Sequence, residues 1–145
     1  MSITESFAAE LLWREVEEDA AAPPGSPIAI VTADAVIDAT LTWEKQKAAY
    51  NEWFAISPNW TPVKYLANAR NAAAHGLGQL TRRQMRKRAS TVSLIAGAHI
   101  IVTKDQIQIT DANLEDAAVS CRTFIEEIDR MARQRRASQG VKSRA

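Results

Sequence analysis

The sequence predicts an all-α fold: a bundle of four to five helices with a short β-hairpin inserted before the last helix. Apolar residues recur at three- and four-residue steps along several long segments, the spacing of one buried helical face. Breaks rich in proline separate the first three of these segments. Strands and helices do not alternate as they would around a parallel sheet. Short connections between helices favour antiparallel neighbours around a bundle core.

The first expected helix runs from Ser2 to about Ala20. Ser2 and Glu5 have the spacing of a capping box, which satisfies main-chain donors at a helix start. Residues 23–27, Pro-Pro-Gly-Ser-Pro, cannot stay helical and predict a stiff linker. Apolar and aromatic residues at helical spacing then predict a second long helix over about 33–55.

A third helix is expected from Pro62 to about Arg88. Thr61 suits the N-cap, and proline is favoured at the first helical position because its missing N–H costs nothing there. Gly76 and Gly78 weaken the helix in its middle, so we expect a kink or local irregularity at that point.

Residues 99–110 contain two short β-prone runs around a polar turn, which predicts a β-hairpin. The last helix is expected to begin near 111–113 and to bury a stripe of apolar residues at three- and four-residue steps. We therefore expect one helical domain over residues 1–133. The remaining residues, 134–145, are basic and predict a disordered tail.

Composition narrows the possible classes of protein. A chain of 145 residues is long enough for one domain with a substantial core. Cys121 is the single cysteine, so an intrachain disulfide and a cysteine-rich zinc cluster are excluded, and it reads as a small core residue. The apolar run Val92–Val102 is too short to span a bilayer, and the N-terminus lacks the pattern of a signal peptide. We expect a cytoplasmic protein that needs no metal, no cofactor and no membrane.

Charge is distributed unevenly, although the formal net charge is only +1. Residues 1–60 contain ten acidic and three basic residues, whereas residues 61–110 contain eight basic residues and one acidic residue. Such a positive segment is what a phosphate-bearing ligand requires. The acidic first half either faces solvent or contacts the basic surface of a partner protein or of a second subunit.

The positive segment contains the sequence Arg70-Asn71-Ala-Ala-Ala-His75, followed by Gly-Leu-Gly. Asn71 and His75 are four residues apart and share one helical face. Arg70 lies about 140° from His75 around an ideal helix, so its long side chain must bridge the difference. A cation, an amide and an imidazole beside small alanines predict a site for a phosphodiester.

The order Arg-Asn-x-x-x-His, on the third long helix of a small all-α bundle, resembles the signature of HEPN domains. Many members of that family are metal-independent RNases of toxins, antiviral systems and RNA-guided nucleases. The resemblance implies an endoribonuclease in bacterial stress or antiviral defence, with Arg70, Asn71 and His75 as catalytic residues. Leu77 stands where one toxin branch has tyrosine. This departure makes that branch, which pairs with a nucleotidyltransferase antitoxin, a poorer match.

Metal-free RNA cleavage requires a base for the 2′-hydroxyl, an acid for the leaving 5′-oxygen and a stabiliser of phosphate charge. Histidine can act as base or acid near neutral pH, and arginine matches two phosphate oxygens. One motif histidine per chain is too few for both proton transfers. The family resemblance implies a homodimer in which two motifs face one cleft, giving a 2′,3′-cyclic phosphate and a 5′-hydroxyl as products.

A second basic cluster follows the motif. We expect it to bind the RNA backbone through phosphate contacts, as an extension of the site. Its residues are Arg82, Arg83, Arg86 and Lys87, and Lys64, which precedes the motif, is expected to bind RNA with them. The alternative is a solvated basic face, or a surface that forms salt bridges with residues 10–19.

We predict structural roles for three other residues. His99 lies within the apolar hairpin, and we expect it to support the fold there. Trp60 and Tyr65 flank the start of the motif helix, where core packing is the simpler interpretation and base stacking the alternative.

Three other interpretations of the chain remain open. Arg70 and His75 can be a surface arginine and a helix-terminal histidine without chemistry. The chain can be a non-catalytic HEPN-like module that dimerises or binds RNA for a partner, such as an antitoxin or effector protein. It can also be a scaffold or toxin-neutralising protein whose acidic half binds a basic partner. That last interpretation is favoured if the most acidic helix carries the main exposed apolar patch.

Overall fold

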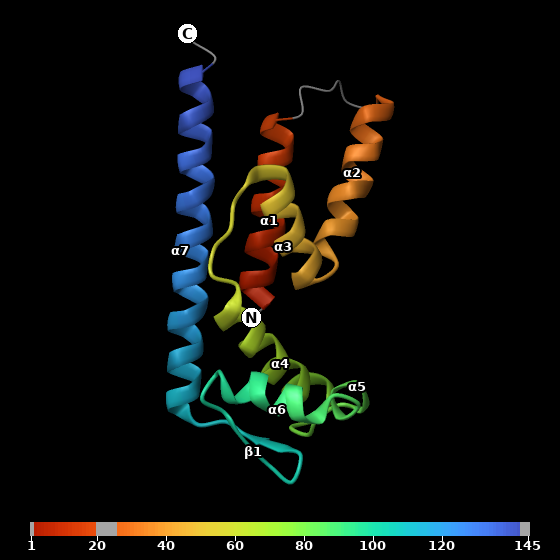
Figure 1. Cartoon of the computed structure of the whole chain (residues 1–145), viewed down its shortest axis with the longest axis vertical. Coiled ribbons are helices and arrows are strands. Elements are labelled where there is room, and N and C mark those ends of the chain that lie inside the picture. The colour runs from red at the N-terminus through yellow and green to blue at the C-terminus, as the bar shows by residue number, and fades with distance from the viewer. Residues whose placement is uncertain (1, 20–25, 143–145) are drawn as a thin grey trace. The chain divides into compact units, whose positions relative to one another are not determined.

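A computed structural model describes residues 2–19 and 26–142 of the chain (Figure 1). In chain order, its elements are α1 (Ser2–Asp19), α2 (Pro27–Thr40), α3 (Trp43–Phe54), α4 (Thr61–His75), α5 (Arg82–Met85), α6 (Arg88–Ala96), β1 (Ile101–Thr103), β2 (Gln106–Gln108) and α7 (Asp111–Lys142). The strands form an antiparallel hairpin in which Val102 pairs with Ile107. The prediction of an all-α fold with a hairpin before the last helix is confirmed. No described helix is long and apolar enough to cross a membrane.

The expected second helix, over 33–55, is divided into α2 and α3. Thr42 adopts an extended conformation between them, and its hydroxyl accepts a hydrogen bond from the Lys45 N–H at 3.2 Å. Thr42 is thus the N-cap of a separate helix, α3, which begins in a different direction from α2. Ser26 caps α2 in the same way, so α2 begins earlier than expected, within the predicted linker. The rest of that linker, up to residue 25, lies outside the described residues.

The expected third helix, from Pro62 to Arg88, ends much earlier, at His75. Two shorter helices, α5 and α6, follow it in place of one continuous helix. At the start of α4, Trp60 holds the N-cap position that the sequence assigned to Thr61. The Thr61 N–H instead donates to Oδ1 of Asn59 at 3.1 Å, so an upstream amide supplies the cap.

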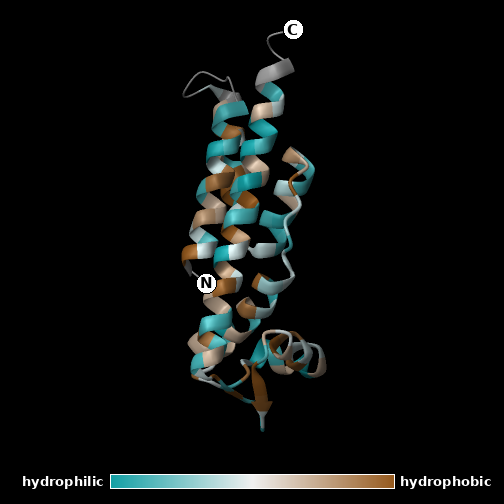
Figure 2. Ribbon diagram, turned by 90° about the vertical axis from the view of Figure 1, so that its left-hand side faces the viewer, coloured by the Kyte–Doolittle hydropathy of each residue, from teal (hydrophilic) through white to brown (hydrophobic). Residues whose placement is uncertain are grey.

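The last helix continues past Arg133, where the sequence predicted a disordered tail. α7 runs to Lys142, and residues 143–145 lie outside the described part. Arg135 and Arg136 explain the extension, because both form ion pairs with acidic residues of α1. Figure 2 shows α7 as largely hydrophilic, with hydrophobic residues recurring along it.

The contacts of the chain separate it into two compact units, where the sequence predicted one domain. The first unit is Asn59–Phe124, and the second combines Ser2–Pro58 with the segment that begins at Ile125. α7 therefore contributes its first turns to one unit and its later turns to the other. We describe each unit by itself.

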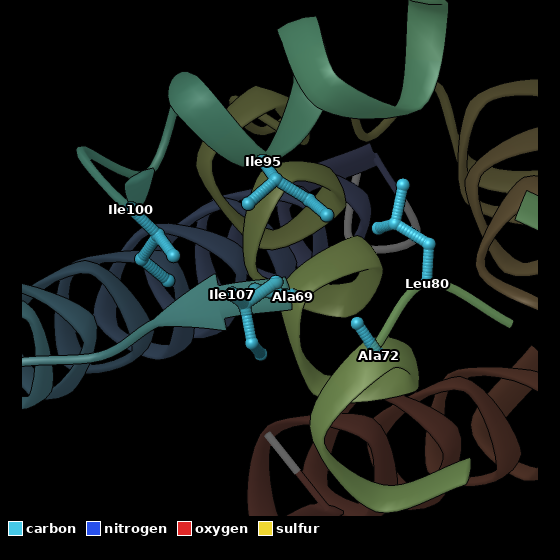
Figure 3. Packing of buried hydrophobic residues seen from close by; sticks show 6 residues of the cluster. All are labelled: Ala69, Ala72, Leu80, Ile95, Ile100 and Ile107. Carbon is cyan, nitrogen blue, oxygen red and sulfur yellow. The ribbon is translucent and has the colours of Figure 1, made fainter. Parts of the chain in front are cut away.

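The core of the first unit is built around α4 (Figure 3). Ala69 and Ala72 of α4 pack with Ile95 of α6 and Ile107 of β2. Leu80 and Ile100 complete this cluster from the adjoining loops. Because the two α4 residues are alanines, neighbouring elements can approach its main chain closely.

The core of the second unit contains a buried carboxylate. Glu15 on α1 is 0% exposed, and Arg135 and Arg136 of α7 both bind it. Arg135 also pairs with Asp19 and lies over the Phe54 ring, 4.5 Å from its centroid. These ion pairs stabilise the Glu15 carboxylate, whose burial without a cationic partner would cost free energy.

Candidate functional site

The buried face of α4 determines which residues of the motif reach solvent. Val63, Leu66, Ala69 and Ala72 are buried at three-residue steps. The sequence therefore orients α4 so that the face carrying Asn71 and His75 stays exposed, while Arg70 is half-buried at its border.

The structure brings Arg70, Asn71 and His75 together, with Arg70 at the centre. Its Nη1 lies 3.2 Å from Nε2 of His75 and donates to Oδ1 of Asn71 at 3.4 Å. The long arginine side chain thus covers the angle around the helix that separates Arg70 from His75. The three residues form one cluster on the surface of α4.

The contact with Arg70 assigns the tautomer of His75. A guanidinium has only donors, so Nε2 of His75 must accept this hydrogen bond. With Nε2 as the acceptor, the N–H of the ring is on Nδ1. No acceptor among the described residues contacts Nε or Nη2 of Arg70. Those donors are therefore available to an anion at the surface.

A tightly bonded loop follows His75 and ends α4. The N–H groups of Gly76 and Gly78 both donate to the Ala72 carbonyl at 3.1 Å. On its other side the loop joins the hairpin, because the Gly78 carbonyl accepts from Ile107 N–H at 2.8 Å. A Cβ on Gly76 would lie 1.8 Å from the Gln79 carbonyl oxygen, so glycine is required there.

Leu77 occupies the tip of this loop in a strained conformation. Its φ is +53°, in the left-handed region that costs a residue with a Cβ about 1–2 kcal/mol. Its side chain is 91% exposed, so no packing within the described residues compensates for this strain. The glycines on both sides of Leu77 are a weak sequence signal for this conformation.

The predicted RNA-binding residues are all exposed. Lys64 lies seven residues before Asn71 and eleven before His75, on the same face of α4. The other four belong to α5 and the turn after it, and they are Arg82, Arg83, Arg86 and Lys87. The structure thus places them on a separate short helix rather than on a continuation of the motif helix.

Gln84 fixes this short helix beside α4. Its side chain forms a capping box with Thr81, and its Nε2 donates to the main-chain carbonyl of Asn68 at 2.8 Å. Asn68 lies less than one turn before Asn71 along α4. The basic side chains of α5 are therefore anchored to the helix that carries the motif. Arg88, in contrast, is engaged by Asp105 at 2.6 Å.

The residues that we interpreted as structural have internal contacts. Trp60 is 7% exposed and packs edge-on against Phe124, with ring centroids 4.9 Å apart. Tyr65 is half-buried, and its ring lies against Gly97. His99 is exposed, with Nδ1 3.4 Å from Oδ2 of Asp116 and its carbonyl bound by Asn113 at 3.1 Å. Each of the three contributes to the packing or hydrogen bonding of the first unit.

No group of three histidine, cysteine or carboxylate side chains within the described ranges is arranged to hold a metal ion. No protein-family model matches this chain, and neither curated proteins nor solved structures gave a significant match.

Proposed function

We propose that this chain is a metal-independent endoribonuclease that acts as a homodimer, with Arg70, Asn71 and His75 as its catalytic residues. The observation that carries the proposal is the contact of 3.2 Å between Nη1 of Arg70 and Nε2 of His75. It places a permanent cation and a titratable ring at one exposed point. Basic side chains of α5 are anchored to the same helix through Gln84.

The three residues have distinct roles in this proposal. Arg70 binds the scissile phosphate through Nε and Nη2 and stabilises the charge that develops on its oxygens. As the guanidinium turns to the phosphate, it releases Nε2 of His75, which then accepts the proton of the 2′-hydroxyl. Asn71 orients the arginine through its Oδ1. The 2′-oxygen attacks phosphorus, and the bond from phosphorus to the 5′-oxygen breaks.

A second histidine is needed to protonate the leaving 5′-oxygen. Each chain has a single histidine in the motif, and the other, His99, is bound to Asp116. In a symmetric homodimer, His75 of the second copy supplies that proton. The products are a 2′,3′-cyclic phosphate and a 5′-hydroxyl. A role in stress or antiviral defence, with a cognate partner protein, follows from the motif resemblance alone.

The test is RNA cleavage in EDTA by the parent and by two matched histidine variants, His75→Asn and His99→Asn. Asparagine tolerates the left-handed backbone of residue 99, so both proteins are expected to fold. We expect His75→Asn to lose activity at least about 100-fold, the usual contribution of a general acid or base. His99→Asn should cleave like the parent and leave the same cyclic-phosphate ends.

The same cleavage assay is applied to Arg70→Ala. Its control is Arg122→Ala, which removes an exposed arginine of α7. Circular dichroism and sedimentation must first show that all variants keep the parent's fold and oligomeric state. Equal cleavage by the parent, His75→Asn and Arg70→Ala would refute the proposal. So would a folded, dimeric parent that leaves RNA intact.

A non-catalytic module that serves a partner protein is the second candidate. One observation favours it: Ile30 and Ile37 of α2 are exposed on one face, which the exposed C-cap residue Leu41 continues. α1 has the most negative net charge of the helices, with six acidic residues and one basic residue, but Ile3 is its only exposed large apolar residue among those described. The described part of α1 therefore lacks the apolar patch that would favour an acidic scaffold. RNA binding without cleavage would favour the module.

A further inference from the structure

We infer that a groove in the second unit binds the apolar face of a basic amphipathic helix from a partner protein. The groove lies between α1, α2 and α3, which pack against one another, and its volume is about 340 Å³. Its apolar lining includes Val16 of α1, Val31 and Ala35 of α2, and Trp53 of α3. Arg70, Asn71 and His75 belong to the first unit, so the inference does not depend on RNA cleavage.

The α2 side of this groove is an uncovered apolar surface. Among the α2 side chains that the structure describes, only Val36 and Ala39 are buried, although two of its fourteen residues are charged. A helix with so few polar residues is usually covered on most of its surface. Val31 is 68% exposed and Trp53 is 41% exposed at the groove. Covering these two side chains would therefore remove apolar area from water and stabilise a complex.

The architecture of the second unit favours a helix as the occupant. Both described strands belong to the first unit, so an extended peptide would find no strand edge here among the described residues. Its main-chain N–H and C=O groups would lose hydrogen bonds to water against apolar side chains. A helix satisfies its main chain internally and presents apolar side chains at three- and four-residue steps. Small ligands bind where polar groups converge, but Asp19, a polar residue of the lining, is already engaged by Arg135.

The charge around the groove favours a basic partner. All ten acidic and all three basic residues of the first sixty lie on α1, α2 and α3, and α2 has no basic residue. Asp34 and Asp38 each follow a groove residue, Val31 and Ala35, by three positions, so they border the groove. Asp34 is exposed and forms no ion pair with a described residue, and the pair of Asp38 with Lys45 is a weak surface pair. Cations beside the apolar face of a partner helix would meet these carboxylates.

A second copy of this chain fits the groove less well. A two-fold pairing through this flank of α2 would bring Asp34 and Asp38 toward their own counterparts, and like charges oppose such contact. The basic helix α5 has four residues and one apolar side chain, Met85, so it lacks an apolar face of the required length. The exposed ring of Trp53 also favours a cation from the partner, because arginine and lysine stack on indole.

The experiment measures binding of three labelled synthetic peptides, each about five helical turns long, by fluorescence anisotropy. The first has leucine on one face and lysine on the other. The second contains the same residues in an order that distributes leucine around the helix, and the third has glutamate in place of lysine. We expect the parent to bind the first peptide at least about ten-fold more tightly than either of the others, because only the first combines both features.

Two pairs of exposed substitutions locate the bound peptide. Val31→Ser removes an apolar side chain from the groove, and Ile37→Ser removes one from another flank of α2. Ala35→Lys places a cation in the groove, and Ala48→Lys makes the same change of charge at an exposed position of α3. We expect Val31→Ser and Ala35→Lys to weaken binding of the first peptide about ten-fold, and the two controls to change it less than about two-fold.

Several results would overturn the inference. Equal affinity for the first two peptides would mean that charge alone attracts them, and equal affinity for the first and third would remove the charge argument. Equal effects of the groove variants and their controls would place the peptide elsewhere, and failure of the folded parent to bind the first peptide would leave the groove without this occupant. Loss of a parent dimer in Val31→Ser, measured by sedimentation, would assign the groove to a second copy.

Discussion

Gln84 of α5 donates a hydrogen bond from Nε2 to the main-chain carbonyl of Asn68 on α4, at 2.8 Å. The other end of the same amide accepts from the N–H and the hydroxyl of Thr81, at 3.0 and 3.1 Å. One buried side chain therefore caps α5 and attaches it to the helix that carries Arg70 and His75. The position of the basic cluster depends on this amide.

Gln84→Ala should destabilise the first unit and weaken RNA binding together. Loss of a cap and of a buried hydrogen bond predicts a decrease of about 1–3 kcal/mol in the free energy of unfolding. Urea denaturation measures this decrease, and Gln108→Ala, at an exposed strand position, should change it by less than about 0.5 kcal/mol. Equal stability of the two variants would show that the amide does not fasten α5.

Gly76→Ala should be more damaging than Gly78→Ala. The added Cβ at residue 76 would lie 1.8 Å from a main-chain oxygen, and the loop must shift to accommodate it. We expect a loss of about 2–3 kcal/mol, as for other overpacked positions. Gly78 has φ +89° and no atom within 4 Å of an added Cβ, so only backbone strain of about 1 kcal/mol is expected. Thermal unfolding of both variants tests the order, which a larger loss in Gly78→Ala would contradict.

Arg83→Ala should reduce the salt dependence of RNA binding. Each phosphate contact to a single strand contributes about 0.7 to the slope of log affinity against log salt concentration. If Arg83 makes one such contact, the slope should decrease by about that amount, as titrations at several salt concentrations can measure. Lys47→Ala removes an exposed cation from α3 and should leave the slope unchanged. The same decrease in both variants would indicate a general charge effect.

The stability of the second unit should depend on pH through Glu15. Burial raises the pKa of this carboxyl above its ordinary value of 4.5, and Arg136 and Arg135 only partly oppose the effect. Between the ordinary pKa and the raised one, Glu15 therefore keeps its proton in the folded protein and releases it in the unfolded chain. The stabilising contribution is complete below the ordinary pKa and is lost as pH rises through the raised one.

Glu15→Gln should remove this titration. The free energy of unfolding of the parent minus that of Glu15→Gln should decrease as pH rises above about 4.5. Glu17→Gln, at an exposed position of α1, serves as the control and should give a difference that does not follow this trend. A difference that grows with pH would mean that the two arginines outweigh burial and hold the pKa of Glu15 below its ordinary value.

Local patterns predicted the elements whose signals are local. Apolar spacing identified α1 and α7, and the paired β-prone runs identified the hairpin at 101–108. The meeting of Arg70 with His75 was also predictable, because it depends on helix geometry and on the length of one side chain. The break at Thr42 was missed because the flanking residues favour helix on both sides, and only the cap marks the restart.

Features that depend on distant partners were not predictable. α4 ends at His75 because Gly78 and Leu80 pair with the hairpin, about thirty residues further along the chain. The strained backbone of Leu77 was not predicted, because it exists only once that loop has formed. The helical segment beyond Arg133 depends on Glu15, 120 residues before Arg135.

The pairing of Glu15 with Arg135 and Arg136 also imposes an order of events during synthesis. The first unit is one continuous segment and can fold as soon as residue 124 is available, whereas the second needs both ends of the described chain. Until residue 135 has been added, the Glu15 carboxylate on α1 has neither of its two arginine partners. Residues 2–58 therefore precede the first unit along the chain but obtain these partners only after it.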